Sequence, residues 1–160
     1  MAVTTDIAAT YRGPGAVMRR LLAMGQREDR ALAMAMGACF LTFLSSLPRL
    51  AREAHLTETS LDQMLGGALM GWIFIAPLGL YAIAALSHLV AKAVGGRGDW
   101  YGARLALFWS FLASTPLILL NGLVAGLVGP GAGLTLVGVA WCAIFAWFWL
   151  RSLKIAEEGA

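Results

Sequence analysis

Long apolar runs separated by short polar segments dominate the chain, and the two longest flank a polar loop in its middle. The first run extends from Leu65 to Ala91, the second from Gly102 to Val128, and residues 92–101 form the loop between them. Each run exceeds the roughly 20 apolar residues that an α-helix needs to cross a bilayer. Because lipid offers the backbone no hydrogen bonds, we predict that both runs are transmembrane helices.

Each of these two runs contains one proline deep in its interior. Pro77 lies 20 residues before Arg97, which is near the middle of the loop, and Pro116 lies 19 residues after it. In an antiparallel hairpin, the two prolines would therefore lie at nearly the same depth. Because proline lacks an N–H group and its ring obstructs the preceding turn, we predict a kinked helical hairpin.

Two further apolar runs predict one additional span on either side of this hairpin. We place the four spans at about 31–50, 62–91, 102–128 and 133–150. The expected fold is therefore all-α, with an integral membrane four-helix bundle over residues 31–150. The glycine-rich segment that precedes the last span predicts a tight turn, because its proline stops the helix and its glycines accept positive φ angles.

The first thirty residues predict a basic segment that does not cross the membrane. They carry five arginines and no sustained apolar core, which is not the pattern of a cleavable signal peptide. We expect residues 1–13 to form an irregular tail and a helix to begin at Pro14. In Pro14–Leu22 an apolar face lies opposite arginines, so we predict an amphipathic helix in the headgroup layer. A solvated helix that leads into the membrane is the alternative.

Composition and charge distribution support this topology. The chain is 59% hydrophobic and 13% charged, whereas ordinary soluble domains contain about 25% charged residues. With four spans, ten of the twelve lysines and arginines lie on one side of the membrane, and Arg49 and Arg52 lie on the other. Cytoplasmic loops are enriched in such cations, so both termini, including the tail 151–160, are expected in the cytoplasm. The candidates for contact with lipid are Arg19, Arg20, Arg27 and Arg97.

Small residues at a spacing of four occur in the second and third predicted spans. The pairs are Gly67 with Gly71 and Gly122 with Gly126. Such pairs let helix backbones approach closely, which strengthens packing where no hydrophobic effect acts between helices. We interpret both pairs as packing sites inside one subunit, and a homo-oligomer remains possible.

Motifs for catalysis are not evident in the sequence. It contains no HExxH, GxSxG or Walker motif, and residues 95–98 read as a flexible turn because no strand precedes them. Cys39 and Cys142 have no CxxC neighbour, so no disulfide or metal framework is predicted. We therefore expect a protein that is not an enzyme, holds no cofactor or metal, and binds membrane lipids and a membrane protein rather than nucleic acid.

Four polar residues inside the predicted spans are the remaining candidates for function. His88 and Arg104 lie near the cytoplasmic ends of spans two and three, where a proton relay or a catalytic histidine is conceivable. A satisfied neutral histidine and an arginine that reaches the interface are the interpretation we favour. Ser114 and Asn121 lie near Pro116, where polar groups compensate a broken helix or, alternatively, line a solute path.

A family pattern is visible in the run Leu86–Leu120. An apolar helix ends in a basic step, a Gly-Gly turn and polar loop follow, and the next helix contains the segment Ser114–Leu117. With the proline-initiated helix of Pro14–Leu22, this run resembles the bacterial short form of the Yip family, membrane proteins named as interactors of Ypt/Rab GTPases. The family usually has five spans, whereas four are predicted here. The DLYGP-type segment of eukaryotic members is absent, so GTPase binding is not carried over.

The resemblance implies a helical membrane fold, a cytoplasmic N-terminus and a non-enzymatic role in organising membrane or protein partners. Together with the short loops, it leads us to expect a multi-pass protein of a bacterial inner membrane that acts as an adaptor, an accessory subunit or a membrane-organising factor. The alternative is a small solute or ion permeation protein that uses the kinked hairpin of spans two and three.

Overall fold

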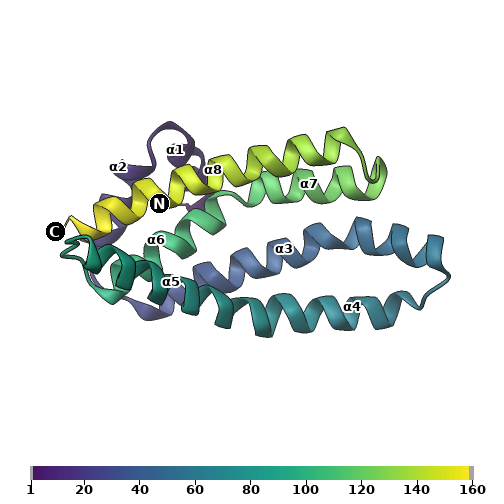
Figure 1. Cartoon of the computed structure of the whole chain (residues 1–160), viewed down its shortest axis with the longest axis horizontal. Coiled ribbons are helices and arrows are strands. Elements are labelled where there is room, and N and C mark those ends of the chain that lie inside the picture. Colours follow the sequence, from purple (N-terminus) through teal and green to yellow (C-terminus); the bar gives the residue numbers. More distant parts are fainter. Residues whose placement is uncertain (1, 159–160) are drawn as a thin grey trace.

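The computed structural model describes residues 2–158, and every regular element in this range is a helix. The helices form an elongated bundle whose long members run side by side (Figure 1). They are α1 (Val3–Arg12), α2 (Pro14–Ala23), α3 (Glu28–Thr57), α4 (Leu61–Met70), the π-helical turn η1 (Gly71–Ile75), α5 (Ala76–Ala93), α6 (Trp100–Ala113), α7 (Thr115–Leu127) and α8 (Ala132–Glu157).

Three helical segments are long and apolar enough to cross a membrane. They are α3, the continuous segment Leu61–Ala93 that joins α4, η1 and α5, and α8. A fourth candidate is the pair α6 and α7, which is bent by 44° at its break. The described chain is therefore all-helical with three candidate spans, or four if the bent pair is one span.

The bend between α6 and α7 follows from Pro116. A proline has no N–H to donate to the carbonyl four residues earlier, which is that of Leu112. The hydroxyl of Thr115 donates to this carbonyl instead, at 2.7 Å. The hydroxyl of Ser114 donates to the carbonyl of Phe111 at 2.8 Å. Two side chains thus satisfy backbone acceptors at the point where the helix changes direction.

Pro77 produces a different local structure from Pro116. It lies in the first turn of α5, directly after the wider π-helical turn η1, and the helix continues through it. Helix α5 then packs against α6, as expected for the hairpin, whereas α7 packs mainly against α3 and α8. Figure 1 shows α7 beside α8 and α4 beside α3. The two helices of the predicted hairpin therefore pair only along the halves next to the connecting loop, which are α5 and α6.

Helix α6 is the centre of the molecule. Of its residues, only Arg104 and Trp100 are not buried. The largest enclosed side chains include Phe108 and Trp109, and the surrounding helices are α1, α3, α5 and α8. A helix that is apolar on all sides is expected to be enclosed by other helices. The first half of the third predicted span is thus enclosed by protein.

The prediction of an irregular tail over residues 1–13 is wrong. These residues form α1, which packs against α2 and α6. The hydroxyl of Thr10 accepts a hydrogen bond from the indole N–H of Trp109 at 3.1 Å, and the carboxylate of Asp6 pairs with Arg20. Burial also raises the pKa of Tyr11 above its usual value. The small side chains of α1 allow close packing, but the composition of the segment does not show that it packs against α2 and α6.

Helix α2 begins at Pro14, as predicted, but its apolar face does not lie against lipid. Val17, Met18 and Leu21 are all at least 97% buried, and α2 packs against α8. The apolar face therefore covers the protein core. The sequence pattern correctly predicts an amphipathic helix. The prediction that its apolar face lies in the bilayer is wrong, because that face packs inside the protein.

The two glycine pairs have opposite surroundings. A Cβ atom on Gly122 would collide with the backbone of Ser45 in α3, and one on Gly126 would collide with Pro48. Gly67 and Gly71 have no atom within 4 Å of the same position. The prediction of packing inside one subunit is thus confirmed for the pair in α7 and wrong for Gly67 and Gly71, which lie in α4 and η1.

Candidate functional site

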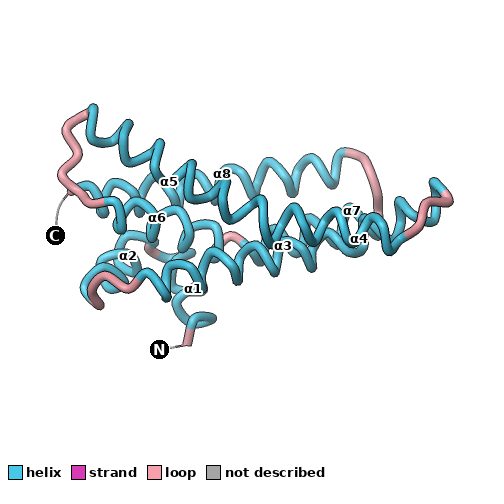
Figure 2. Tube along the Cα trace, turned by 90° about the horizontal axis from the view of Figure 1, so that it is seen from below, coloured by secondary structure: helices cyan, strands magenta, loops and turns pink. Residues whose placement is uncertain are grey.

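One end of the bundle gathers segments that are far apart in the sequence. Helices α1 and α2, the connector 94–99 and the last turns of α8 lie together there, and the loops 58–60 and 128–131 lie at the opposite end (Figures 1 and 2). We call the first of these the basic end, because it holds ten of the twelve lysines and arginines. Arg49 and Arg52 belong to the other end.

A buried pair of His88 and Glu157 connects three elements at the basic end. The Nδ1 atom of His88 in α5 lies 2.7 Å from Oε1 of Glu157 in α8. The two residues are only 2% and 8% exposed. The imidazole also packs on the ring of Trp100, with ring centroids 4.5 Å apart. His88 is thus held between the C-terminal turn of α8 and the start of α6.

Glu157 also holds the connector 94–99 in place. Its second carboxylate oxygen accepts a hydrogen bond from the backbone N–H of Gly98 at 3.2 Å. Its backbone carbonyl accepts one from the backbone N–H of Arg97 at 2.8 Å. Gly95 supplies a positive φ angle of 97° at the end of α5. The sequence pattern predicts a flexible turn here, whereas the backbone of the connector is fixed by the last turn of α8.

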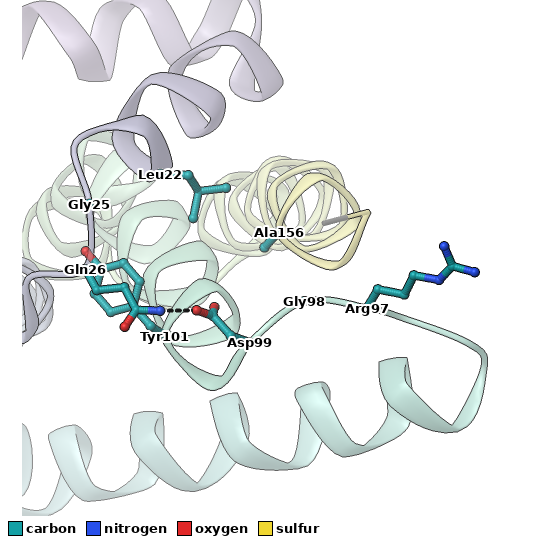
Figure 3. Close-up of a pocket in the computed structure, with 8 residues that line it drawn as sticks. All are labelled: Leu22, Gly25, Gln26, Arg97, Gly98, Asp99, Tyr101 and Ala156. Carbon is teal, nitrogen blue, oxygen red and sulfur yellow. Dashed lines mark hydrogen bonds between the residues drawn. The ribbon is translucent and has the colours of Figure 1, made fainter. Parts of the chain in front are cut away.

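A cleft of about 320 Å³ opens between the connector and the loop that follows α2. Figure 3 shows Gln26 donating to Asp99 across its mouth, while the side chain of Arg97 points away from the cleft. Asp99 also caps α6 by accepting a hydrogen bond from the N–H of Gly102 at 2.7 Å. On the cleft wall, the hydroxyl of Tyr101 accepts a hydrogen bond from Arg30 at 3.1 Å.

The candidate arginines divide into paired and unpaired groups. Arg20 pairs with Asp6, Arg27 with Asp29 at 2.9 Å, and Arg104 with Glu28. Arg19 and Arg97 are exposed and form no ion pair or side-chain hydrogen bond with other described residues. Arg104 and His88 therefore each have a separate carboxylate partner.

The polar residues near Pro116 lie in different environments. Ser114 is fully buried, and its hydroxyl accepts a hydrogen bond from the indole of Trp141 at 3.1 Å in addition to its bond to the backbone. Asn121 is half-buried, and its carbonyl oxygen has no hydrogen-bond partner among the described residues. Ser114 therefore serves packing, and Asn121 retains an unused acceptor.

Glu157 and Asp6 are residues that the sequence pattern does not single out. Glu157 lies in the segment that reads as a charged tail, although α8 continues through it. Its position on the helix gives a signal in retrospect, because Trp149, Leu153 and Glu157 follow one another at intervals of four. A carboxylate that continues an apolar helix face points toward a buried partner.

The chemistry of this end is that of a structural junction. The described residues contain no group of three or more His, Cys, Asp or Glu side chains arranged to hold a metal ion. His88 and Glu157 are buried and hydrogen-bonded to each other, so this contact joins α5 to α8. The exposed charged groups of the basic end include carboxylates such as Glu28 and Asp29, but also Arg19 and Arg97, which form no ion pair with other described residues.

Comparison with known proteins gives one match. The family model described as the Yip1 domain matches residues 8–159, which is nearly the whole chain. No curated protein and no solved structure gives a significant match.

Proposed function

Because the chain belongs to the Yip1-domain family, we propose that it is a non-catalytic membrane protein that binds another membrane protein as an adaptor or accessory subunit. Proteins of this family are generally non-catalytic membrane proteins that interact with other proteins. The observation that carries the proposal is the open glycine face of α4 and η1, made up of Gly66, Gly67 and Gly71.

This face combines features that favour a partner helix over lipid alone. Glycine lowers the stability of a helix interior by roughly 0.5–1 kcal/mol relative to alanine, so three glycines within two turns need a compensating contact. Within the described chain no atom approaches their Cβ positions. Small residues at this spacing allow a second helix to pack closely in a membrane. The π-helical turn η1, a feature frequently found at functional sites, lies in the same region.

Crosslinking in the membrane tests the proposal. A photoreactive residue at Met70, which is 54% exposed and follows Gly66 and Gly67 by four and three residues on the same helix face, is expected to give a recurrent crosslinked partner. Gly67→Leu should abolish this product, and Gly79→Leu, about three turns further along the same span, should preserve it. A stable monomer with no recurrent product in the wild type would contradict the proposal.

We also propose a topology in which the basic end faces the cytoplasm of a bacterial cell. The support is the gathering of ten cations at this end, since cytoplasmic segments are enriched in lysine and arginine. A single cysteine at position 96 or 97 should resist a membrane-impermeant reagent in intact cells and react after lysis. Labelling of intact cells would overturn the orientation.

Permeation remains the second candidate function, and the unused acceptor of Asn121 favours it. The buried hydroxyl of Ser110 likewise has no partner among the described residues. Flux through the reconstituted protein that is lost in Asn121→Leu would support a solute path. Absence of flux for small ions and polar solutes would remove it.

A further inference from the structure

A second cleft at the basic end lies between the start of α2 and the last turns of α8. Its volume is about 380 Å³. Four cations line it, two from the N-terminal helices and two from α8: Arg12, Arg19, Arg151 and Lys154. One carboxylate, that of Glu158, lies among them, and it is 3.8 Å from Lys154 in an exposed pair. The cleft therefore has a clear excess of positive charge.

The three arginines of this cleft differ from most other arginines of the molecule in having no partner among the described residues. Of the ten arginines, six form an ion pair or a side-chain hydrogen bond with a described residue. Three of the other four are Arg12, Arg19 and Arg151. Like charges gathered in one cleft repel each other unless an anion lies between them. The arrangement thus calls for an anionic ligand.

The start of α2 adds to this positive potential. Gly13 occupies the N-cap position, and no side chain caps the helix. The first amide groups of a helix carry a partial positive charge, which favours anions. Gly15 brings this helix start against α8, because a Cβ atom there would press on the side chain of Ile155.

An apolar surface continues from the cleft toward the middle of the bundle. Trp147 lines the cleft one turn before Arg151 and is 43% exposed. Beyond it, exposed apolar residues of α8 include Val139 and Leu136, at 62% and 70% exposure. Tryptophan prefers the boundary between headgroups and acyl chains. A bilayer crossed by α8 would therefore place this cleft at the depth of the headgroups and the exposed apolar residues of α8 at the depth of the acyl chains.

We propose that this cleft binds the phosphate group of an anionic phospholipid, whose acyl chains lie along the exposed face of α8. Arginine recognises phosphate oxygens through paired N–H donors, and two arginines from different helices can grip one phosphate from two sides. Free phosphate shares the headgroup chemistry but cannot use the apolar face. The inference does not depend on the proposed partner of α4, which lies on a different surface.

Lipid retention by the full-length protein in non-ionic detergent tests this proposal. Native mass spectrometry would compare bound phosphatidylglycerol with bound phosphatidylcholine, with inorganic phosphate and glycerol phosphate as soluble competitors. We expect preferential binding of phosphatidylglycerol, reduced roughly tenfold to thirtyfold by Arg12→Gln with Arg151→Gln. The matched control, Lys92→Gln with Arg97→Gln, removes the same charge from the same end outside the cleft and should change binding less than about twofold.

Two further results distinguish binding in the cleft from a general effect of charge and from misfolding. The charge-conserving variant Arg12→Lys with Arg151→Lys should retain most of the binding, which shows that the loss in the glutamine variant comes from charge and not from misfolding. Equal loss in the cleft variant and the control would overturn the proposal, because the preference would then reflect the total charge of this end. Full displacement of the lipid by millimolar inorganic phosphate would overturn the lipid assignment in favour of free phosphate.

Discussion

Helix α7 and the continuous segment formed by α4 and η1 each carry two glycines four residues apart, and the two pairs meet opposite surroundings. Gly122 and Gly126 lie against the backbone of α3, while nothing approaches the Cβ positions of Gly67 and Gly71 among the described residues. The same motif is thus a closed contact in one helix and an unused surface in the other. The difference shows that small-residue spacing identifies a face able to pack closely and says nothing about which helix will occupy it.

The largest expected effect on stability comes from disrupting the contact between α7 and α3. Gly122→Leu places a side chain where the carbonyl carbon of Ser45 lies 2.7 Å from the Cβ position. Because backbone and not a flexible side chain must move, we expect a loss of about 3 kcal/mol or more in the free energy of unfolding. Denaturation of the purified protein in detergent, followed by tryptophan fluorescence, measures it. An unchanged midpoint would show that α7 is not packed on α3.

Removing the buried hydrogen bonds of Glu157 should have the next largest effect on stability. Glu157→Ala leaves His88 and the N–H of Gly98 without their acceptor in a buried environment. Leaving buried donors unsatisfied costs roughly 1–3 kcal/mol, so we expect a loss of about 2 kcal/mol. Hydrogen exchange should also become faster at residues 96–98. Protection that equals the wild type would contradict the role assigned to Glu157.

A smaller effect is expected at the cap of α6. Asp99→Ala removes the acceptor for the N–H of Gly102, and a lost N-cap typically costs about 1 kcal/mol. Asp99→Asn keeps an acceptor and is the matched control. The same denaturation assay distinguishes them, and equal stability of the two variants would show that the cap is dispensable.

The smallest effect on stability is expected on the open face. Gly67→Leu meets no neighbouring atom and improves helix propensity, so we expect the free energy of unfolding to change by less than about 0.5 kcal/mol or to rise slightly. The partner crosslink should nevertheless disappear. A large loss of stability together with the crosslink would mean that this face packs inside the subunit after all, and the comparison between α4 and α7 would fail.

Three of the four predicted spans correspond to long apolar helices and the remaining one, the third, to a bent pair of helices, because hydrophobicity and length are local properties of the sequence. The sequence also predicts the break at Pro116 and the helix start at Pro14, since both follow from the missing N–H of proline. The packing of α1 on α6 could not be predicted in this way. It depends on one contact between residues 99 positions apart, Thr10 and Trp109, which no local pattern records.

The candidate site can be predicted only in part, for a related reason. His88 stands out in the sequence because an ionisable residue within a span needs a partner. Its partner Glu157 lies 69 residues away in a segment that reads as a polar tail. Counting charges identifies the basic end, but it cannot separate arginines with a carboxylate partner from those without one. That separation depends on side-chain positions in the folded chain.

The position of Glu157 has a consequence for the order in which the protein assembles. Glu157 follows His88 by 69 residues and Gly98 by 59 residues in the chain. Synthesis from the N-terminus therefore completes α5, the connector and α6 before their shared acceptor exists. The connector can take its final form only once α8 has been made, and a nascent chain that stops before α8 would carry His88 and the N–H of Gly98 without this partner.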